Sequence, residues 1–318
     1  IGRYALRGMG VVAGDVDDDG DTDIYVANDK DMNLLFINNG RGRFTESSMI
    51  LGAGFNANGL AEAGMGVDVG DINRNGLLDI FVTNYSGETN TLYLNQGHGL
   101  FLDETDFKGL GRPSFHFLAF GTKFIDLNLD GWLDLYVGNG HVIDNINLFN
   151  NQYSHRQHDQ IYMNESGTFI DQTKLIGLDL QDKFVSRGVA RADIDNDGDI
   201  DLIISNNNDE ASLLINEGVP QNNWIGFYLK GVEANQQAIG SKIKIHTNSG
   251  SQVSYVNPSG SYLSSNDQRI VFGLGKEEKV KMVEVFWAGG IEKEIFNNLD
   301  SNHYYKIIEG VSISIITY

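Results

Sequence analysis

The chain has 318 residues, 41% of them apolar, a length and content that suit two globular domains with substantial buried cores. Its formal net charge is −20, from 43 acidic and 23 basic residues, which argues against nucleic acid as a partner. There is no cysteine, so the chain has no disulfide or thiol chemistry. No stretch approaches the ~18 uninterrupted apolar residues of a membrane-spanning helix. The sequence begins at Ile1 without a signal peptide, and we expect a mature or trimmed product.

One acidic nine-residue loop occurs four times, at residues 15–23, 71–79, 126–134 and 193–201. Its pattern is Asp-x-Asp/Asn-x-Asp/Asn-Gly-x-x-Asp, with side-chain oxygens at positions 1, 3, 5 and 9 and a free backbone carbonyl at position 7. Oxygen ligands wrap hard divalent cations in this way, and the glycine at position 6 permits a sharp turn. We therefore predict about four Ca²⁺ sites. The predicted metal-site residues are Asp15, Asp17, Asp19, Asp21, Asp23, Asp71, Asn73, Asn75, Leu77, Asp79, Asp126, Asn128, Asp130, Trp132, Asp134, Asp193, Asp195, Asp197, Asp199 and Asp201.

The residues after each loop decide which kind of calcium loop it is. An EF-hand needs flanking helices and a bidentate Glu at position 12. Position 12 is here an aliphatic residue, within a short β-branched and aromatic run that predicts a strand. These residues are Val26, Val82, Val137 and Ile204. The flanks therefore favour a calcium hairpin between two strands and exclude the EF-hand.

The loops begin at residues 15, 71, 126 and 193, which gives a period of 56, 55 and then 67 residues. Each unit has a glycine-rich strand before the loop, a strand after it and a third strand that ends in Asn; the first three units add a fourth strand. In chain order the predicted strands cover 8–13, 24–28, 34–38 and 43–46; 64–69, 80–84, 91–95 and 100–103; 120–125, 135–139, 160–164 and 168–171; and 187–192, 202–206 and 212–216. An insertion at 140–160 lengthens the third unit. Four antiparallel strands per unit predict β-propeller blades.

Residues 1–218 resemble the FG-GAP repeats, also called VCBS repeats, which are related to the calcium-binding blades of integrin α-subunit propellers. The resemblance rests on the loops, their flanking strands and the Asn-Gly-x-Gly-x-Phe element, which recur in register. It implies an all-β fold of propeller blades, bound calcium and an extracellular or cell-surface location. Proteins of this family usually have more than four repeats, so we expect an incomplete ring.

Residues 224–310 resemble the domain called ASPIC/UnbV, which commonly follows such repeats, and residues 219–223 are the expected linker. The matching segments are Leu229–Gly231, Ala238–Ile243, Ser259–Ser265, Phe272–Gly275 and Val283–Trp287. The family usually has Pro after this Trp, where this chain has Ala288. The Gly-Ser-Tyr and Gly-Leu-Gly segments are typical of turns in a small β-sandwich.

The end of the chain, residues 311–318, is an alternating, uncharged segment with high β-propensity. One hypothesis is that it remains unpaired within its own domain and docks on a neighbouring subunit, which would build an extracellular assembly. The opposite end, Arg3–Leu6, could dock in the same way. The alternative is that residues 311–318 form the last strand of their own domain.

Other candidate chemistry is weaker. Gly8–Ala13 matches the dinucleotide pattern G-x-G-x-x-A, but it leads into a calcium loop and not into a helix, so we exclude this function. His155-x-x-His158 could hold a metal, although an ordinary polar insertion is the favoured interpretation. Aromatic residues that recur at equivalent blade positions predict core packing. Four less regular ones could line a binding rim: Tyr85, Phe115, Phe117 and Trp132.

The four loops differ in ligand charge. The first and fourth supply only Asp at positions 1, 3, 5 and 9, whereas the second has Asn73 and Asn75 and the third has Asn128. Since ligand charge tunes calcium affinity, we predict that the second loop binds most weakly.

Three functions fit these patterns. The favoured one is a non-catalytic, calcium-binding extracellular structural or adhesion protein, whose partner is a protein, including a second copy, or a glycan. The second is a carbohydrate-binding propeller module, which would show exposed aromatic residues near Trp132 or Tyr85. The third is a propeller enzyme of the polysaccharide lyase or dehydratase type, which would need convergent charged side chains in the central channel. Propeller architecture alone does not choose among them.

Overall fold

The computed structural model of the chain describes residues 6–175, 182–219, 221–289 and 293–317. Within these ranges strands predominate, which confirms the predicted all-β fold. The short helices of the described part are α1 (Ser48–Leu51), α2 (Gly111–Ser114) and η1 (Ile146–Leu148). No helix in these ranges is long and apolar enough to cross a membrane.

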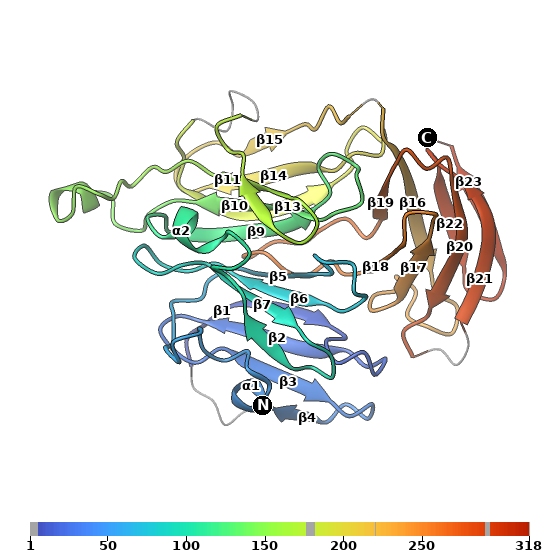
Figure 1. Cartoon of the computed structure of the whole chain (residues 1–318), viewed down its shortest axis with the longest axis horizontal. Helices are drawn as coiled ribbons and strands as arrows, with labels where there is room; N and C mark the ends of the chain where they lie inside the picture. Colours follow the sequence, from blue (N-terminus) through green and yellow to red (C-terminus); the bar gives the residue numbers. More distant parts are fainter. Residues whose placement is uncertain (1–5, 176–181, 220, 290–292, 318) are drawn as a thin grey trace.

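Four successive sheets, the blades, make up the first domain (Figure 1). Blade 1 contains β1 (Gly8–Gly14), β2 (Asp23–Asn28), β3 (Leu34–Asn38) and β4 (Phe44–Glu46). Blade 2 contains β5 (Val67–Gly70), β6 (Asp79–Val82), β7 (Thr91–Asn95) and β8 (Phe101–Asp103). Blade 3 contains β9 (Ala119–Ile125), β10 (Asp134–Asn139), β11 (Gln160–Asn164) and β12 (Phe169–Asp171). Blade 4 contains β13 (Ser186–Ala192), β14 (Asp201–Asn206) and β15 (Ser212–Leu214).

Each blade is antiparallel, and its strands pair in sequence order, as predicted. Successive residues of a strand point to opposite faces of its sheet, so a blade buries apolar side chains against both of its neighbours. Three apolar clusters therefore lie between successive blades. In the first of them, Tyr25 of blade 1 packs against Tyr93 of blade 2, with ring centroids 6.3 Å apart. The core of this domain is thus formed by the stacking of blades.

In blades 2–4, an Asn at the end of the third strand, or two residues past it in blade 4, also fastens the blade to the one before it. Its Nδ2 donates to the backbone carbonyl of loop position 2 in the preceding blade. The three bonds are Asn95 to Val16 at 2.7 Å, Asn164 to Ile72 at 2.8 Å and Asn216 to Leu127 at 3.0 Å. Each predicted calcium loop that has a following blade is therefore bonded directly to it.

Over the described residues the blades form an open arc and not a closed ring. β1 lies beside β5, β5 beside β9 and β9 beside β13 (Figure 1). The far face of blade 4 carries Ile203 and Leu213, which are 45% and 54% exposed. The equivalent residues of blade 2, Phe81 and Leu92, are 0% exposed because they lie in the cluster shared with blade 3.

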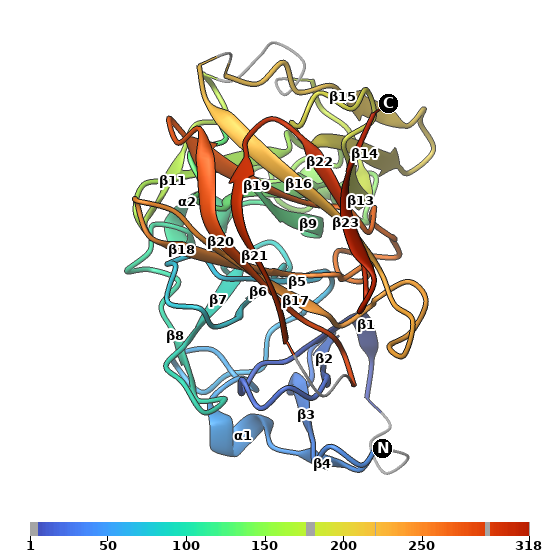
Figure 2. The same cartoon turned by 90° about the vertical axis from the view of Figure 1, so that its right-hand side faces the viewer.

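The second domain is a sandwich of two four-stranded sheets, ordered β19-β16-β22-β23 and β18-β17-β20-β21 (Figure 2). Its strands are β16 (Asn223–Lys230), β17 (Lys242–His246), β18 (Ser251–Tyr255), β19 (Ile270–Gly275), β20 (Lys279–Phe286), β21 (Lys293–Asp300), β22 (Tyr304–Ile308) and β23 (Ser312–Ile316). One apolar cluster fills the space between the sheets, with Phe227 from one sheet and Ile243 and Val283 from the other. This arrangement agrees with the expected β-sandwich.

The final strand corrects one hypothesis. β23 pairs antiparallel with β22, and Ile313 packs against the core of the second domain. The chain reverses between them at a turn in which Val311 N donates to Ile308 O at 3.0 Å. The interpretation of residues 311–318 as an unpaired tail is therefore wrong, and the alternative of a last strand of the domain is correct. Residues 3–5, from the other proposed docking segment, lie outside the described residues.

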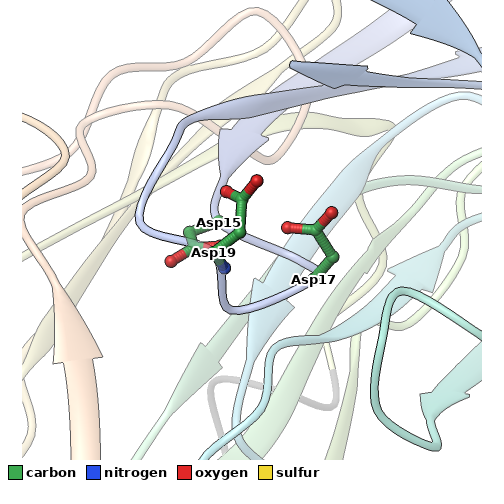
Figure 3. Close-up of side chains that lie close together, drawn as sticks. All are labelled: Asp15, Asp17 and Asp19. Carbon is green, nitrogen blue, oxygen red and sulfur yellow. The ribbon is translucent and has the colours of Figure 1, made fainter. Parts of the chain in front are cut away.

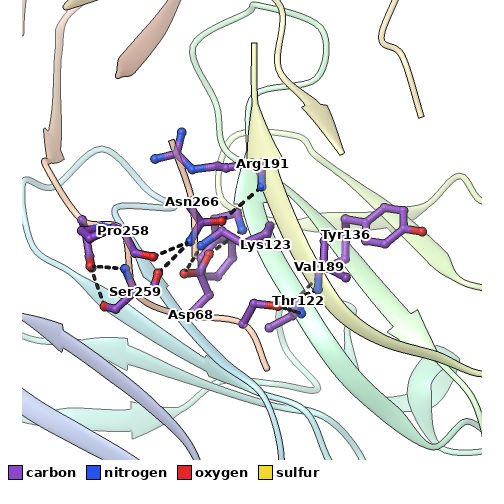
Figure 4. Close-up of polar contacts among 12 residues, drawn as sticks. Asp68, Thr122, Lys123, Tyr136, Val189, Arg191, Pro258, Ser259 and Asn266 are labelled. Carbon is purple, nitrogen blue, oxygen red and sulfur yellow. Dashed lines mark hydrogen bonds and ion pairs between the residues drawn. The ribbon is translucent and has the colours of Figure 1, made fainter. Parts of the chain in front are cut away.

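One segment of the second domain, residues 256–269 between β18 and β19, enters the inner side of the arc (Figures 1 and 4). We call it the axial segment. Its Ser259 Oγ accepts the N–H of a β1 residue at 3.3 Å, and its Ser261 forms an antiparallel bridge with β5. Ser261 Oγ also accepts the N–H groups of Thr122 on β9 and Val189 on β13, each at 3.2 Å. The axial segment thus contacts the innermost strand of every blade.

We predict that Leu92→Ala lowers the free energy of unfolding by about 2–5 kcal/mol, because it leaves a cavity between blades 2 and 3. Leu213→Ala, the same change at the equivalent exposed position of blade 4, is the matched control and should cost less than about 0.5 kcal/mol. Urea denaturation followed by circular dichroism measures both. An equally large loss for both variants would show that the far face of blade 4 is covered in solution.

Candidate calcium sites

All four loops adopt the same backbone conformation. Position 4 has a φ between 58° and 65° in every loop, and the glycine at position 6 has a φ between 86° and 99°. A glycine adopts such angles without a steric penalty, which explains its place in the pattern. The Asp at position 1 then accepts the N–H groups of positions 5 and 6, at 2.7–3.2 Å in every loop.

The Asp at position 9 is almost fully buried in every loop. These residues, Asp23, Asp79, Asp134 and Asp201, are 0–1% exposed. One carboxylate oxygen accepts the N–H of position 2, and the other accepts the N–H of the Asn that ends the third strand, at 2.8–3.1 Å. The position-9 carboxylate therefore ties its loop to the third strand, and each oxygen keeps a lone pair for a cation.

The side chains at positions 1, 3 and 5 come together as the pattern predicts. In the first loop, Asp15, Asp17 and Asp19 each offer an oxygen, and these atoms lie within 4.8 Å of one another (Figure 3). Asp193, Asp195 and Asp197 form the same cluster in the fourth loop. Oδ1 of Asp17 is buried and has no hydrogen-bond partner among the described residues. An all-oxygen donor set with an unpartnered buried oxygen fits Ca²⁺.

The second and third loops have the same backbone but replace some carboxylates with carboxamides. Asn73 Oδ1 accepts the N–H of Asn75 at 3.0 Å, and Asn128 Oδ1 accepts that of Asp130 at 3.0 Å, so position 3 is oriented alike in both. The Asn128 side chain also donates to Asp130 at 3.1 Å. These loops offer the same oxygen positions at lower ligand charge.

Burial perturbs the loop carboxyls. Burial, with a smaller contribution from neighbouring acidic residues, raises the pKa of Asp15 to about 6 and the pKa values of Asp23, Asp79 and Asp134 to about 7. Carboxylates removed from water are costly in their charged form unless a cation compensates them. A divalent cation bound in the loop would supply that compensation.

The second domain lies against the end of the propeller that carries these loops. Lys242 Nζ of β17 is 2.6 Å from Asp18 Oδ1 in the first loop. In the third loop, Leu129 O accepts the N–H of Gly275 at 2.8 Å. Gly273 approaches so closely that a Cβ there would lie 2.1 Å from Asp126 Oδ2. The first and third acidic loops are therefore part of the interface between the domains.

Three charged side chains that the sequence analysis did not single out meet at the inner side of the arc (Figure 4). Lys123 Nζ lies 2.7 Å from Asp68 Oδ1, both side chains are 4% exposed, and Arg191 lines the same cavity. Asp68 and Lys123 each lie three residues before a loop, a periodic placement that could have revealed the pair. The axial segment leaves a cavity of about 70 Å³ here. A polar cavity of this size can hold ordered water.

The four aromatic residues considered for a binding rim lie in different surroundings. Trp132 stacks on Arg74, with 4.2 Å between the guanidinium and the ring centroid, and joins the second and third loops. Tyr85 lies instead beyond the opposite end of β6, where its ring contacts His141 at 5.3 Å and His141 faces Tyr153 at 6.2 Å. Phe115 is 42% exposed, and Phe117 lines a separate cavity of about 650 Å³.

The histidines of the third-unit insertion do not form a recognisable metal centre. Burial lowers the pKa of His141, whose side chain is fully buried. The Nδ1 atoms of His155 and His158 are buried without a hydrogen-bond partner among the described residues. Neither residue belongs to a cluster of three or more potential metal ligands in the described part of the chain.

Known proteins match the chain along most of its length. The FG-GAP-like repeat family matches residues 15–82, 71–137 and 126–204, and the ASPIC and UnbV family matches residues 231–314. Cartilage acidic protein 1 of Homo sapiens is 26% identical over 315 residues, which are 97% of this chain and 44% of that protein. The Xenopus tropicalis protein of the same name is 26% identical over 295 residues, 89% of this chain and 42% of that protein. The chain spans less than half the length of these relatives.

Similar solved structures are more distant. An Agrocybe aegerita lectin that recognises non-reducing terminal N-acetylglucosamine is 20% identical, with a TM-score of 0.41 over 78% of this chain and 60% of the lectin chain. The rhamnogalacturonan lyase of Bacillus licheniformis is 13% identical, with a TM-score of 0.36 over 94% of this chain and 59% of the lyase chain. The FG-GAP-like matches cover more than half of the chain and coincide with the four loops and blades. The chain belongs to the FG-GAP-like repeat family and carries a C-terminal ASPIC/UnbV domain.

Proposed function

We propose that this protein is a non-catalytic structural or adhesion protein of the extracellular space, stabilised by calcium in its four loops. The observation that carries the proposal is the fourfold recurrence of one oxygen-lined turn with the same backbone angles and hydrogen bonds. Extracellular calcium modules typically bind with a Kd of about 10⁻⁴–10⁻³ M, which matches the calcium level outside cells. The partner is a protein or a glycan. Self-association would use the outer edge of β23, which is the last strand of its sheet.

In this proposal, bound calcium stabilises the folded propeller. Four Ca²⁺ ions contribute +8 against a net charge of −20 and leave −12, so much of the acidity serves as ligand. At ~10⁻⁴ M affinity and about 1 mM calcium, each site adds roughly 1.4 kcal/mol of stability. Val16, Ile72 and Leu127 at loop position 2 each accept a bond from the next blade, so an ordered loop also holds the blade interface.

Removal of calcium should lower the thermal midpoint by more than about 10 °C, because four sites together contribute roughly 5–6 kcal/mol. Differential scanning calorimetry with 1 mM calcium and with excess EDTA measures the shift, and calcium added back is the control. Light scattering of the same samples reports self-association. An unchanged midpoint, together with no heat of calcium binding, would contradict the proposal.

Asn73→Asp should tighten calcium binding at the second loop by about tenfold, because it restores a carboxylate at position 3 and ligand charge tunes affinity. Asn58→Asp is the matched control, since it adds the same charge at an exposed position outside the loops. Isothermal titration of both variants measures the weakest of the four affinities. If Asn73→Asp leaves that affinity unchanged, the second loop is not the weakest site.

A carbohydrate-binding module is the second candidate, and one observation favours it. Tyr85, His141 and Tyr153 form an aromatic cluster in loops outside the strands, and Tyr85 is only half-buried. Aromatic rings of this kind serve as platforms for sugars. Tyr85→Ala should abolish any glycan-array signal, whereas Tyr228→Ala in the second domain should preserve it. Signals that survive Tyr85→Ala would remove this cluster from consideration.

A further inference from the structure

The second domain packs closely against the fourth loop and contacts its position-1 carboxylate directly. Tyr304, on β22, is 2% exposed, and its hydroxyl donates to Asp193 Oδ2 at loop position 1. The Trp224 ring covers the glycine at position 6 so closely that a Cβ on Gly198 would lie 1.9 Å from it. The Trp224 and Tyr304 rings contact each other at 4.9 Å between centroids.

The side chain of Arg269, from the second domain, hydrogen-bonds to the same loop. The guanidinium of Arg269 donates to the backbone carbonyl of Asp193 and to Oδ1 of Asn196 at 2.6 Å. Its Nε is held at 2.6 Å from Asp267 Oδ2. Arg269 also lies over the Tyr304 ring, 5.1 Å from its centroid. The ring and hydroxyl of Tyr304 and the guanidinium of Arg269 therefore contact one another and lie around Asp193 at loop position 1.

The first three loops have no equivalent contact on their position-1 carboxylates. Among the described residues, the hydrogen bonds to Asp15, Asp71 and Asp126 come from N–H groups of their own loops. In the fourth loop, Asp193 Oδ2 accepts from both Gly198 N and the Tyr304 hydroxyl, whereas Oδ1 accepts only from Asp197 N. Two donors occupy the lone pairs of Oδ2, whereas Oδ1 keeps a lone pair that is available for a cation.

We propose that the fourth calcium site is a composite of both domains, in which Tyr304 and Arg269 are positioning residues for the ligand Asp193. Calcium occupancy of this loop and docking of the second domain are then coupled. Residues that orient a metal ligand typically contribute 10–100-fold to metal affinity. Coupling between two binding events is reciprocal. If docking of the second domain tightens calcium binding, bound calcium therefore strengthens docking by the same factor. The inference rests on the proposed calcium binding.

The experiment compares the full chain with Tyr304→Phe, which keeps the packed ring and removes the hydroxyl. Calcium titration by calorimetry should show one of the four sites weakened by about 10–100-fold and three unchanged. Tyr305→Phe is the matched control, because the Tyr305 hydroxyl bonds to Asp300 within the second domain. Four unchanged affinities in Tyr304→Phe, or the same weakening in Tyr305→Phe, would overturn the proposal.

A second measurement tests the reverse direction, from calcium to docking of the second domain. Hydrogen exchange of the β22 amides in the unaltered chain should be faster in excess EDTA than in calcium, and the calcium effect should be much smaller in Tyr304→Phe. Equal calcium protection in both chains would contradict coupling. If the unaltered chain binds no calcium at all, the proposed function itself fails. Calcium binding without any response to Tyr304→Phe refutes only the composite site.

Discussion

The propeller depends on one buried carboxylate per blade, the Asp at loop position 9. Each of these groups accepts one N–H from its own loop and one from the third strand of the same blade. The Asn that provides the second N–H also donates its side chain to the preceding blade, as Asn95 does to Val16. A continuous series of hydrogen bonds therefore links the loop to the third strand of its own blade and, through the Asn side chain, to the preceding blade. Because these carboxylates are buried close to further acidic side chains, a cation bound in the loop would relieve their mutual repulsion.

The second domain packs against the same loops. Its strands and loops contact the first, third and fourth calcium loops, and its axial segment bonds to the innermost strands of all four blades. The domain thus connects blades that are not neighbours in the arc. This arrangement closes the inner side of the propeller over Asp68, Lys123 and Arg191, around a small cavity.

The repeat, the loops and the blade strands could be predicted because they depend on local sequence. Alternation, the Asp/Asn/Gly spacing and the terminal Asn of the third strands all lie within one unit. The additional hydrogen bond that Asp23 or Asp79 accepts from the third strand could not be predicted, because it depends on how that strand is placed beside loop position 9. The Asp193–Tyr304 contact joins residues 111 positions apart, which no local pattern reveals. The hairpin of β22 and β23 is also local, and the glycine-containing turn at Gly310 is the sequence signal that could have predicted it.

The most direct test of the central claim is anomalous X-ray diffraction from crystals of the full chain grown in calcium. We predict an anomalous peak in each of the four loops, about 2.3–2.6 Å from the side-chain oxygens of positions 1, 3, 5 and 9 and from the carbonyl of position 7. In the fourth loop the peak should lie on the Oδ1 side of Asp193, opposite the Tyr304 hydroxyl. Loops that remain ordered without any anomalous peak at millimolar calcium would contradict the claim that calcium stabilises this propeller.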